Sequence, residues 1–215
     1  LEPYYTLLEK VIGVAGDDSN PFVRRSAPYP MPPLRPFRLG EAFREATTAM
    51  GLHPHPVPVG MNSVPYDGRP ATTYTAWSNG FGSYTDDKWH PGLSSIPQAL
   101  ATGNFDLRTH CRVVRILTDG TGHASGVEYV DAGGTQHVQA ARTVILSSYL
   151  YENVRLLLLS GDGRHPNGLG NNAGQVGKHY MTKMFAHVDG FFPDTIFNRH
   201  TGPAAQGVVL DDYVV

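Results

Sequence analysis

The fold of this chain is decided by residues 105–160, FDLRTHCRVVRILTDGTGHASGVEYVDAGGTQHVQAARTVILSSYLYENVRLLLLS. Apolar and β-branched residues cluster there in runs that predict five strands, at 105–109, 111–117, 125–131, 135–140 and 143–148. The turns TDGTGHA and AGG between the middle runs have the glycine-rich chemistry of β-hairpins. The middle runs therefore predict an antiparallel β-meander.

The last of these runs, TVILSS at 143–148, predicts a different kind of strand. It is continuously apolar until its two serines, which is typical of a parallel strand covered on both faces. It leads directly into YLYENVRLLLLSG, which predicts a helix that ends at Gly161. We therefore predict a meander, a buried parallel strand and a helix, in a chain of the α/β class.

The flanking sequence predicts three further helices and one strand. The helices are expected at EPYYTLLEKVIG, LGEAFREATTAMG and SSIPQALATG, each followed or closed by a glycine that can adopt a left-handed conformation. Five prolines between Pro28 and Pro36 predict an extended, rigid connector packed over a core. The run MFAHVDGFF near the end of the chain predicts a strand.

Composition excludes several classes of function. The 215 residues are 40% hydrophobic with a formal net charge of −2, which suits one or two domains with a core. No basic stripe with interleaved aromatic residues indicates nucleic-acid binding, and no apolar run approaches the roughly 20 residues of a membrane helix. The chain starts at Leu1 rather than Met and ends at LDDYVV, so we expect both ends to be internal to a longer protein.

Four stretches resemble the glucose–methanol–choline (GMC) oxidoreductases, a family of FAD-dependent enzymes. They are ALATGNFDLRTHCRVVRI, SGVEYVDAGG, ARTVILSSYLYENVRLLLLSG and NGLGNNAGQVGKHYM. Within the family, PYPMPPL and the run Tyr151 to Arg155 are most similar to the flavoprotein subunits of gluconate, sorbitol and fructose dehydrogenases. The resemblance covers essentially the whole chain.

This resemblance implies a domain organisation. Residues 1–97 would be a substrate-domain or cap segment with connector loops, residues 98–162 the C-terminal part of a Rossmann-like FAD-binding domain, and residues 163–215 the start of a second substrate-domain segment. The glycine fingerprint that binds the FAD pyrophosphate is absent; GLGNNAG at 168–174 resembles it only loosely and follows no strand. We expect the fingerprint upstream of this chain, and the chain alone to be inactive.

The resemblance also implies cofactor contacts. The main chain of Val113, in the first meander strand, matches the position that meets the adenine edge. Ser147, Ser148 and Tyr149 stand where the family often has Ala-Ala-Gly beside the cofactor. Losing that glycine puts the usual close backbone approach in doubt, while serine still permits approach and hydrogen bonding.

No residue of this chain is assigned a catalytic role. The family removes the hydroxyl proton of the substrate with a histidine near the C-terminus, and none of the ten histidines here lies in a matching motif. The long aromatic loop at 68–92 contributes the candidates Trp77, Asn79 and Trp89 for a wall of the substrate pocket; the alternative is a packed surface loop. Many relatives carry cysteines in this loop, and this chain has none there.

Two polar patterns are interpreted as structural. His53 and His55 form an H-x-H without third and fourth ligands at metal-binding spacing, so we predict no metal site. The adjacent pairs Asp86-Asp87 and Asp211-Asp212 are expected to be solvated.

The implied reaction oxidises a CH–OH group of a sugar, sugar acid or polyol, with hydride passing to N5 of FAD. Electrons would leave to a cytochrome, a quinone or oxygen. Two alternatives stay open: a GMC alcohol oxidase with another substrate, and a non-catalytic β-rich binding module. The compartment is also open, between a periplasmic or membrane-associated location through partner subunits and the cytoplasm.

Overall fold

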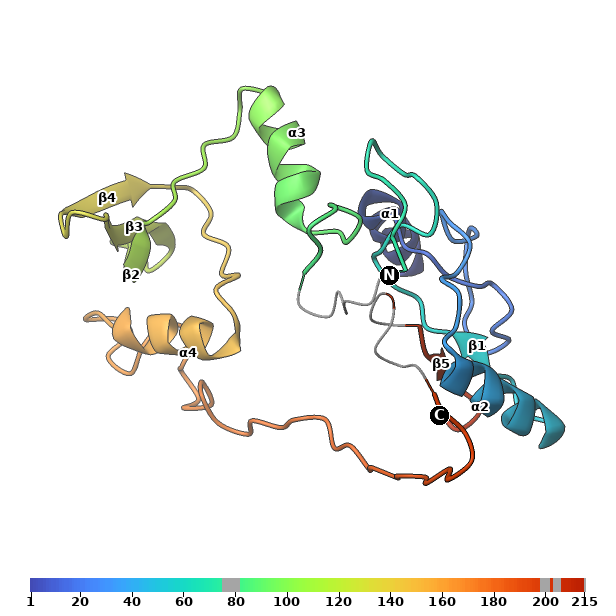
Figure 1. Ribbon diagram of the computed structural model, residues 1–215. Helices are drawn as coiled ribbons and strands as arrows, with labels where there is room; N and C mark the ends of the chain where they lie inside the picture. Colours follow the sequence, from blue (N-terminus) through green and yellow to red (C-terminus); the bar gives the residue numbers. More distant parts are fainter. Residues whose placement is uncertain (75–81, 198–201, 203–205, 215) are drawn as a thin grey trace. The chain divides into compact units, whose positions relative to one another are not determined.

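The computed structural model describes residues 1–74, 82–197, 202 and 206–214 (Figure 1). The chain divides into two compact units: Leu1–Asp106 together with Gly190–Val215, and Leu107–Asp189. Helices and sheets are both present, which confirms the predicted mixed α and β character. No helix among the described residues is long and apolar enough to span a membrane. The candidates Trp77 and Asn79 lie outside the described residues.

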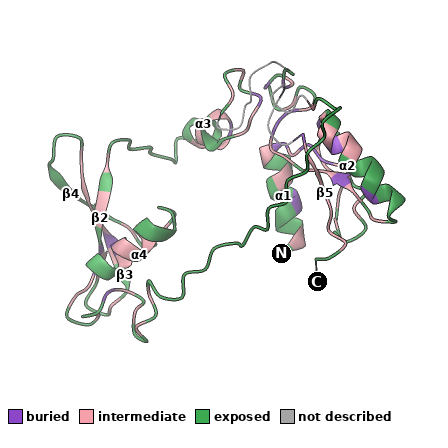
Figure 2. Cartoon of the chain, turned by 60° about the horizontal axis from the view of Figure 1, so that its bottom comes forward, coloured by how far each residue is buried: buried purple, intermediate pink, exposed green. Residues whose placement is uncertain are grey.

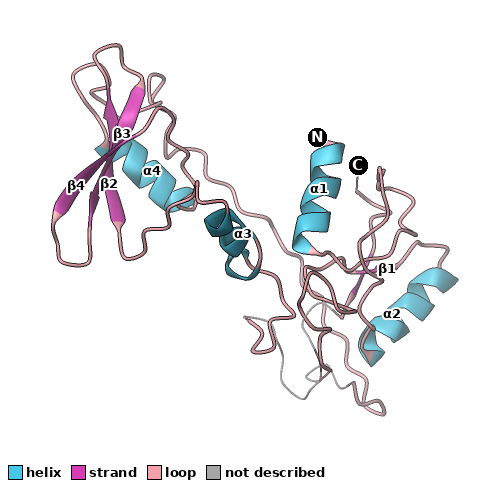
Figure 3. Ribbon diagram, turned by 90° about the horizontal axis from the view of Figure 1, so that it is seen from above, coloured by secondary structure: helices cyan, strands magenta, loops and turns pink. Residues whose placement is uncertain are grey.

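The unit Leu107–Asp189 is built on the predicted meander. Strands β2 (Arg112–Thr118), β3 (Ala124–Val130) and β4 (Gln136–Ala140) form an antiparallel sheet in the order β2-β3-β4 (Figure 3). Both hairpin turns are closed by an aspartate that accepts backbone N–H groups: Asp119 from Thr121 and His123, and Asp131 from Gly133 and Thr135. These local bonds explain why the turn sequences alone predicted the meander.

Two bulges interrupt the ladder between β2 and β3. Val113 pairs with Tyr129 and Arg115 with Glu128, so Val114 is an extra residue on β2. The second irregularity lies opposite Leu117 and Thr118, next to Gly126 on β3. A Cβ atom built on Gly126 would lie 2.4 Å from the carbonyl oxygen of Gln139 on β4, so only glycine fits there.

Helix α4 (Leu150–Leu159) packs along β2, and the small core of this unit lies between them. Ile116 on β2 and Leu156 on α4 are its buried apolar side chains. The hydroxyl of Ser160 accepts the N–H of Ile116 at 2.8 Å and donates to the carbonyl of Leu156 at 2.6 Å. Arg115 adds a bond to the carbonyl of Gly161 at 2.8 Å, so the C-terminal end of α4 is fixed to the sheet.

Three predicted strands are wrong. Residues 105–109, 143–148 and 184–192 form no strand in the structure. A strand requires a neighbour that satisfies its backbone groups, and none of the described residues pairs with these runs. Their apolar side chains are consequently open to solvent: Ile145 is 83% exposed and Met184 97%. The chain around α4 is largely coloured as exposed or intermediate in Figure 2.

The other unit contains the three helices predicted from the flanking sequence, which are confirmed. They are α1 (Glu2–Ile12), α2 (Arg38–Ala49) and α3 (Ser95–Ala101), the last preceded by the short 3₁₀ helix η1 (Pro91–Leu93). Gly13 follows α1 with φ 74°, the left-handed conformation that its sequence position predicted. Strands β1 (His55–Pro56) and β5 (Val208–Val209) pair antiparallel.

Loops rather than helices supply the core of this unit. Ala15 pairs with both Met31 and Val59, and Ala15, Met31, Leu34 and Met61 are buried. Met31 and Leu34 come from the proline-rich stretch, which confirms that it is an extended connector packed over a core. Proline suits this role because its ring fixes φ, so an extended backbone costs little conformational entropy on folding.

The prediction that both aspartate pairs are solvated is wrong. Asp86 is exposed, but Asp87 is fully buried and accepts hydrogen bonds from the hydroxyls of Ser83 and Thr85. Burial raises the pKa of Asp87, but hydrogen bonds from hydroxyl groups outweigh this effect, so the pKa is lowered overall.

The second aspartate pair clamps the end of the chain to the segment before β1. Asp212 accepts the backbone N–H of His53, and its carboxylate lies 2.8 Å from the Nδ1 atom of that histidine. Asp211 lies 3.3 Å from the Nε2 atom of the buried His55. These pairings extend the short β1–β5 ladder.

The close approach at Gly126 generates a stability prediction. We expect Gly126→Ala to lower the free energy of unfolding by about 1–3 kcal/mol, because the new methyl group collides with the backbone of β4. Urea unfolding followed by circular dichroism measures this change. Gly120→Ala is the matched control, since no atom lies within 4 Å of its Cβ position. Equal stability of the two variants would contradict the prediction.

Candidate functional site

The predicted cofactor residues Ser147, Ser148 and Tyr149 lie in the segment that enters α4. All three are exposed, and the turn is held by reciprocal bonds with Asn153. The N–H of Ser148 donates to Oδ1 of Asn153 at 2.9 Å, and the N–H of Asn153 donates to the carbonyl of Tyr149 at 2.9 Å. The side chains of this segment are therefore exposed to solvent, while hydrogen bonds with Asn153 hold its backbone in place.

Tyr149 has an unusual backbone conformation. It caps α4 with φ 73° and ψ 160°, a region that is populated almost entirely by glycine. The resemblance implies a glycine at this position, and the backbone has a conformation that glycine prefers. The tyrosine therefore adopts a strained geometry, with its ring 73% exposed.

Val113 lies at the same end of the unit as this segment. The hydrogen bond from Arg155 lowers the pKa of Glu152, in the first turn of α4, and the charge of Arg112 lowers it further. The start of β2 is thus close to the start of α4. Val113 itself is half-buried, and the bulge at Val114 disrupts the ladder beside it. A bulge leaves a backbone group without a strand partner, which suits a main-chain contact to a ligand.

A cavity of about 560 Å³ opens beside the first turns of α4. Leu150, Tyr151 and Val154 line one side, and the segment 177–181 lines the other. The rings of Tyr149 and Tyr151 are 5.9 Å apart, and those of Tyr151 and Tyr180 are 5.5 Å apart. Sequence reasoning missed this cavity, because no pattern links residues 151 and 180 before the chain folds back over α4.

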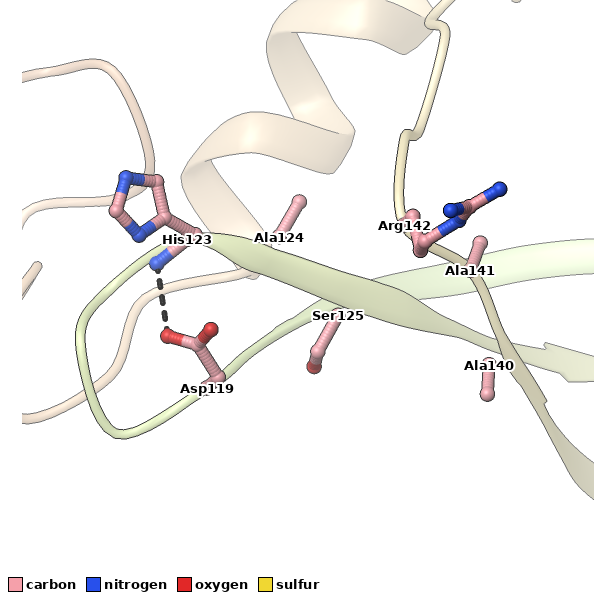
Figure 4. Close-up of a pocket in the computed structure, with 7 residues that line it drawn as sticks. All are labelled: Asp119, His123, Ala124, Ser125, Ala140, Ala141 and Arg142. Carbon is pink, nitrogen blue, oxygen red and sulfur yellow. Dashed lines mark hydrogen bonds between the residues drawn. The ribbon is translucent and has the colours of Figure 1, made fainter.

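A second depression, of about 740 Å³, lies at the β2–β3 hairpin and the end of β4 (Figure 4). Asp119 and His123 line one end, while the guanidinium of Arg142 points away from them at the other end (Figure 4). Asp119 accepts bonds from the hydroxyl and N–H of Thr121 and the N–H of His123, which lower its pKa to about 2. The carboxylate closes the turn and does not converge with Arg142 on a common point.

Trp89, a substrate-pocket candidate, has its polar groups engaged within the protein. Its indole N–H donates to the hydroxyl of Ser94 at 2.6 Å, and its backbone N–H donates to the carbonyl of Gly60 at 2.8 Å. The ring is half-buried. Trp89 thus holds the start of α3 to the loop before it, and its role in a pocket wall stays a prediction.

The histidines of the H-x-H pattern have protein partners. Nδ1 of His55 lies 3.3 Å from the carbonyl of Pro56, and its Nε2 lies 3.0 Å from the amide nitrogen of Asn20 as well as near Asp211. Within the described part of the chain, no group of three or more His, Cys, Asp or Glu side chains is placed to hold a metal ion.

Comparison with known proteins defines the class. Residues 34–180 match the model of the GMC oxidoreductase family, and the chain belongs to that family. It is 30% identical to the gluconate 2-dehydrogenase flavoprotein of Pantoea cypripedii, over 99% of this chain and 38% of that protein. It is 36% identical to the 2-methyl-1,2-propanediol dehydrogenase of Mycolicibacterium austroafricanum, over 87% of this chain and 34% of that protein.

Two further relatives are named for other substrates. The chain is 30% identical to the paromamine 6'-oxidase of Streptomyces fradiae, over 100% of its length and 40% of that protein. It is 29% identical to the large subunit of the fructose dehydrogenase of Gluconobacter japonicus, over 84% of its length and 33% of that protein. The chain thus spans between a third and two fifths of the length of these relatives.

The backbone strain at Tyr149 leads to a prediction with an unusual sign. We expect Tyr149→Gly to raise the free energy of unfolding by about 1 kcal/mol, because glycine adopts this conformation without strain. The matched control is Tyr151→Gly, two residues on, which we expect to lower it by about 1 kcal/mol because its backbone is helical. Urea unfolding compares the three proteins. Destabilisation by both substitutions would contradict the strain at Tyr149.

Two aspartates with lowered pKa values, Asp119 and Asp162, make the stability of this unit depend on pH. The hydroxyl of Thr118 and the N–H groups of His165 and Arg164 lower the pKa of Asp162, and the turn lowers that of Asp119 to about 2. An unfolded aspartate titrates near about 3.9. Both carboxylates therefore stabilise the fold above that pH, and this contribution is lost as the pH falls through the folded pKa.

We accordingly expect the thermal midpoint to decrease as the pH falls from about 5 to about 2. In the double variant Asp119→Asn and Asp162→Asn, the midpoint at neutral pH should be lower and its decrease with acid smaller. Glu45→Gln, at an exposed position of α2, serves as a control, and its thermal midpoint should change with pH as that of the parent does. Calorimetry at a series of pH values measures the thermal midpoint of each protein. If the midpoint of the double variant falls with pH as steeply as that of the parent, these carboxylates do not govern acid unfolding.

Proposed function

We propose that this chain is part of an FAD-dependent dehydrogenase that oxidises a CH–OH group of a sugar, a sugar acid or a polyol. The observation that carries the proposal is the match of residues 34–180 to the GMC oxidoreductase family. Relatives named for gluconate, fructose and a propanediol support a hydroxyl-rich small molecule as substrate. FAD supplies the hydride acceptor, N5 of its isoalloxazine ring.

The residues of the candidate site fit a dinucleotide. The bulged backbone at Val113 offers main-chain groups for an adenine edge, which requires no particular side chain. Ser147 and Ser148 are small and exposed, so a cofactor can approach the backbone that leads into α4. We assign these residues, with Tyr149, to FAD binding. Their task is to hold and orient the cofactor, and we assign no general base to this chain.

The electron acceptor and the location are further parts of the proposal. We propose a cytochrome or a quinone as acceptor, and a periplasmic or membrane-associated location through partner subunits. The support is the likeness to a relative named as the large subunit of a dehydrogenase. A cytoplasmic location is the alternative.

A GMC alcohol oxidase is the second candidate function. It is favoured by the likeness to paromamine 6'-oxidase and 6'''-hydroxyparomomycin C oxidase. The two functions differ in what reoxidises the flavin: oxygen in an oxidase and an electron carrier in a dehydrogenase. The non-catalytic binding module receives no support from the family match.

One experiment separates these functions. The protein that carries this chain is purified and its absorbance spectrum recorded for bound flavin. Anaerobic addition of gluconate, fructose, sorbitol and a propanediol should bleach the flavin with at least one of them. Reoxidation by a dye but not by oxygen supports the dehydrogenase, and release of peroxide supports the oxidase. A protein without flavin, or one that no hydroxyl substrate bleaches, would overturn the proposal.

The return segment provides a prediction of cofactor occupancy. In the whole protein, we expect Ser148→Trp to lower the molar ratio of flavin to protein at least about tenfold, because an indole fills the space beside the backbone that the cofactor approaches. Ser19→Trp, at an exposed serine outside this unit, should keep the parent ratio. Thermal unfolding checks that both variants are folded. Equal flavin content in two folded variants would show that Ser148 is an ordinary residue of the turn.

A further inference from the structure

Asp87 is a buried carboxylate that has no positively charged partner in the described part of the chain. It is 0% exposed, and none of the ion pairs among the described residues involves it. Burial raises its pKa, while the groups that lower the pKa are hydroxyls and its own backbone, which carry no charge. A buried carboxylate in a protein is normally paired with a cationic side chain or bound to a metal ion. Asp87 therefore lacks the partner that its charge requires.

The two oxygens of this carboxylate have different surroundings. Oδ1 accepts hydrogen bonds from the hydroxyl of Ser83 and, at 3.0 Å, from the hydroxyl of Thr85. The N–H of Thr85 in turn donates to Oγ of Ser83 at 3.2 Å, so the two hydroxyls are held in place. Oδ2 is closed to solvent and accepts no hydrogen bond from the described residues. The carboxylate is therefore fixed through one oxygen, and its other oxygen is unused.

Asn62 lies opposite Asp87 in a short antiparallel pairing. Met61 bridges to Lys88, and the N–H of Asn62 donates to the carbonyl of Asp87 at 2.9 Å. Residues that lie opposite each other in an antiparallel pair project their side chains to the same face, with Cβ atoms about 4.5–5.5 Å apart. The side chains of Asn62 and Asp87 therefore lie side by side.

The amide group of Asn62 is oriented by three carbonyl groups. Its Nδ2 atom donates to the carbonyls of Tyr66, Arg69 and Pro70 at 3.3, 3.2 and 3.1 Å. A carbonyl oxygen accepts from N–H groups only, so these contacts exclude the flipped amide. Oδ1 therefore points away from the three carbonyls, and it is buried without a hydrogen-bond partner among the described residues.

Thr72 brings a third oxygen to the same place. Its N–H donates to the carbonyl of Asn62 at 2.7 Å. Its hydroxyl is close enough to the carboxylate of Asp87 to lower the pKa of that group, but the two are not aligned for a hydrogen bond. Oδ2 of Asp87, Oδ1 of Asn62 and Oγ1 of Thr72 are here called the oxygen cluster. None of the three has a hydrogen-bond partner in the described part of the chain.

The oxygen cluster does not depend on which surfaces of this chain are exposed. Thr72 is 7% exposed, and Asn62 and Asp87 are fully buried. The three oxygens are already closed to solvent, so a further segment of a longer protein does not reach them without displacing the residues that cover them. A buried polar atom without a partner costs stability, and three of them side by side indicate a bound ion.

We propose that the oxygen cluster binds a calcium ion, with Asp87, Asn62 and Thr72 as ligands. The cluster consists of oxygen atoms alone, which suits a hard cation rather than a metal that prefers thiolate or imidazole. It combines one carboxylate with two neutral oxygens, so it differs from a group of three acidic or histidine side chains, of which the described residues contain none. The hydroxyls of Ser83 and Thr85 orient the carboxylate, as hydrogen bonds around a metal site do.

Calcium fits the oxygen cluster better than other occupants. It accepts carboxylate and amide oxygens in irregular arrangements, whereas magnesium requires a nearly octahedral set and retains several waters, which a closed site does not favour. A buried water satisfies polar atoms but leaves the charge of Asp87 without a counter-charge. Because only one ligand is charged, we expect weak binding, with a Kd of about 10⁻⁴–10⁻³ M.

The test compares calcium binding and thermal stability in the whole protein that carries this chain. Protein dialysed against a chelator is titrated with calcium, and bound calcium is measured by equilibrium dialysis. We expect the parent to bind about one more ion per chain than Asp87→Asn, and its thermal midpoint to rise by about 1–3 °C at about ten times the Kd. Asp86→Asn is the matched control, because this neighbouring aspartate is exposed, and it should behave as the parent does.

Thr72→Val distinguishes a ligand from a structural hydroxyl. Valine has nearly the same shape and lacks the oxygen. Because this hydroxyl makes no hydrogen bond to the described residues, the midpoint without calcium should stay within about 1 °C of the parent or rise. The affinity for calcium should fall about tenfold. A lower midpoint without calcium, together with unchanged affinity, would show that the hydroxyl is structural and would overturn the proposed ligand set.

The remaining outcomes each decide the proposal. Magnesium or sodium at the same ionic strength should shift the midpoint less than calcium does, and an equal shift overturns the assignment to calcium. Equal calcium binding by the parent and by Asp87→Asn, with circular dichroism showing both folded, overturns the site. A parent that calcium neither binds nor stabilises does so too, and is the result expected for a buried water. If Asp87→Asn does not fold, the affinity of Thr72→Val decides. The flavin is not involved, so the flavin content of the whole protein tests the proposed function independently.

Discussion

The structure of the unit Leu107–Asp189 depends on one hydroxyl group. Ser160 accepts the N–H of Ile116 and donates to the carbonyl of Leu156, so a single side chain joins the edge strand β2 to the last turn of α4. Both bonds are buried, where an unpaired polar group would be costly. This junction sets the path of α4 along β2, and as a result the first turn of α4 comes to lie beside Arg112 at the start of the strand.

That arrangement gathers the proposed cofactor contacts at one end of the unit. Val113 follows Arg112, and Tyr149 caps the helix whose first turn lies near it. The bulge at Val114 and the left-handed backbone of Tyr149 are both departures from regular structure. Regular strands and helices satisfy their own backbone groups, so such departures are where a ligand can meet the main chain. The membership of the chain in the GMC family gives these departures a chemical interpretation.

The unit Leu107–Asp189 has a small apolar core. Large exposed side chains of this unit include Ile145, the tyrosines around α4, and Met184, Phe185 and Val188, while Ile116 and Leu156 are the only buried large apolar residues described in the unit. A small core of this kind supplies limited stability, so the hairpin aspartates and the Ser160 junction carry more of it. The other unit is stabilised in a similar way. Its proline-rich connector supplies buried side chains, and His53 and His55 pair with Asp212 and Asp211.

The sequence by itself determined the meander, the helices and the family, because these depend on residues close in the chain. Hairpin turns, helix caps and apolar periodicity are local, and so are the motifs that resemble GMC oxidoreductases. Only the tertiary structure decided the rest. The run at 143–148 has strand composition but no strand partner among the described residues. Asp87 is buried beside the hydroxyls of Ser83 and Thr85, and segment 177–181 lines a cavity with the first turns of α4. The physical reason is that unpaired strands, buried charges and cavities are defined by neighbours that are distant in sequence, which local composition does not specify.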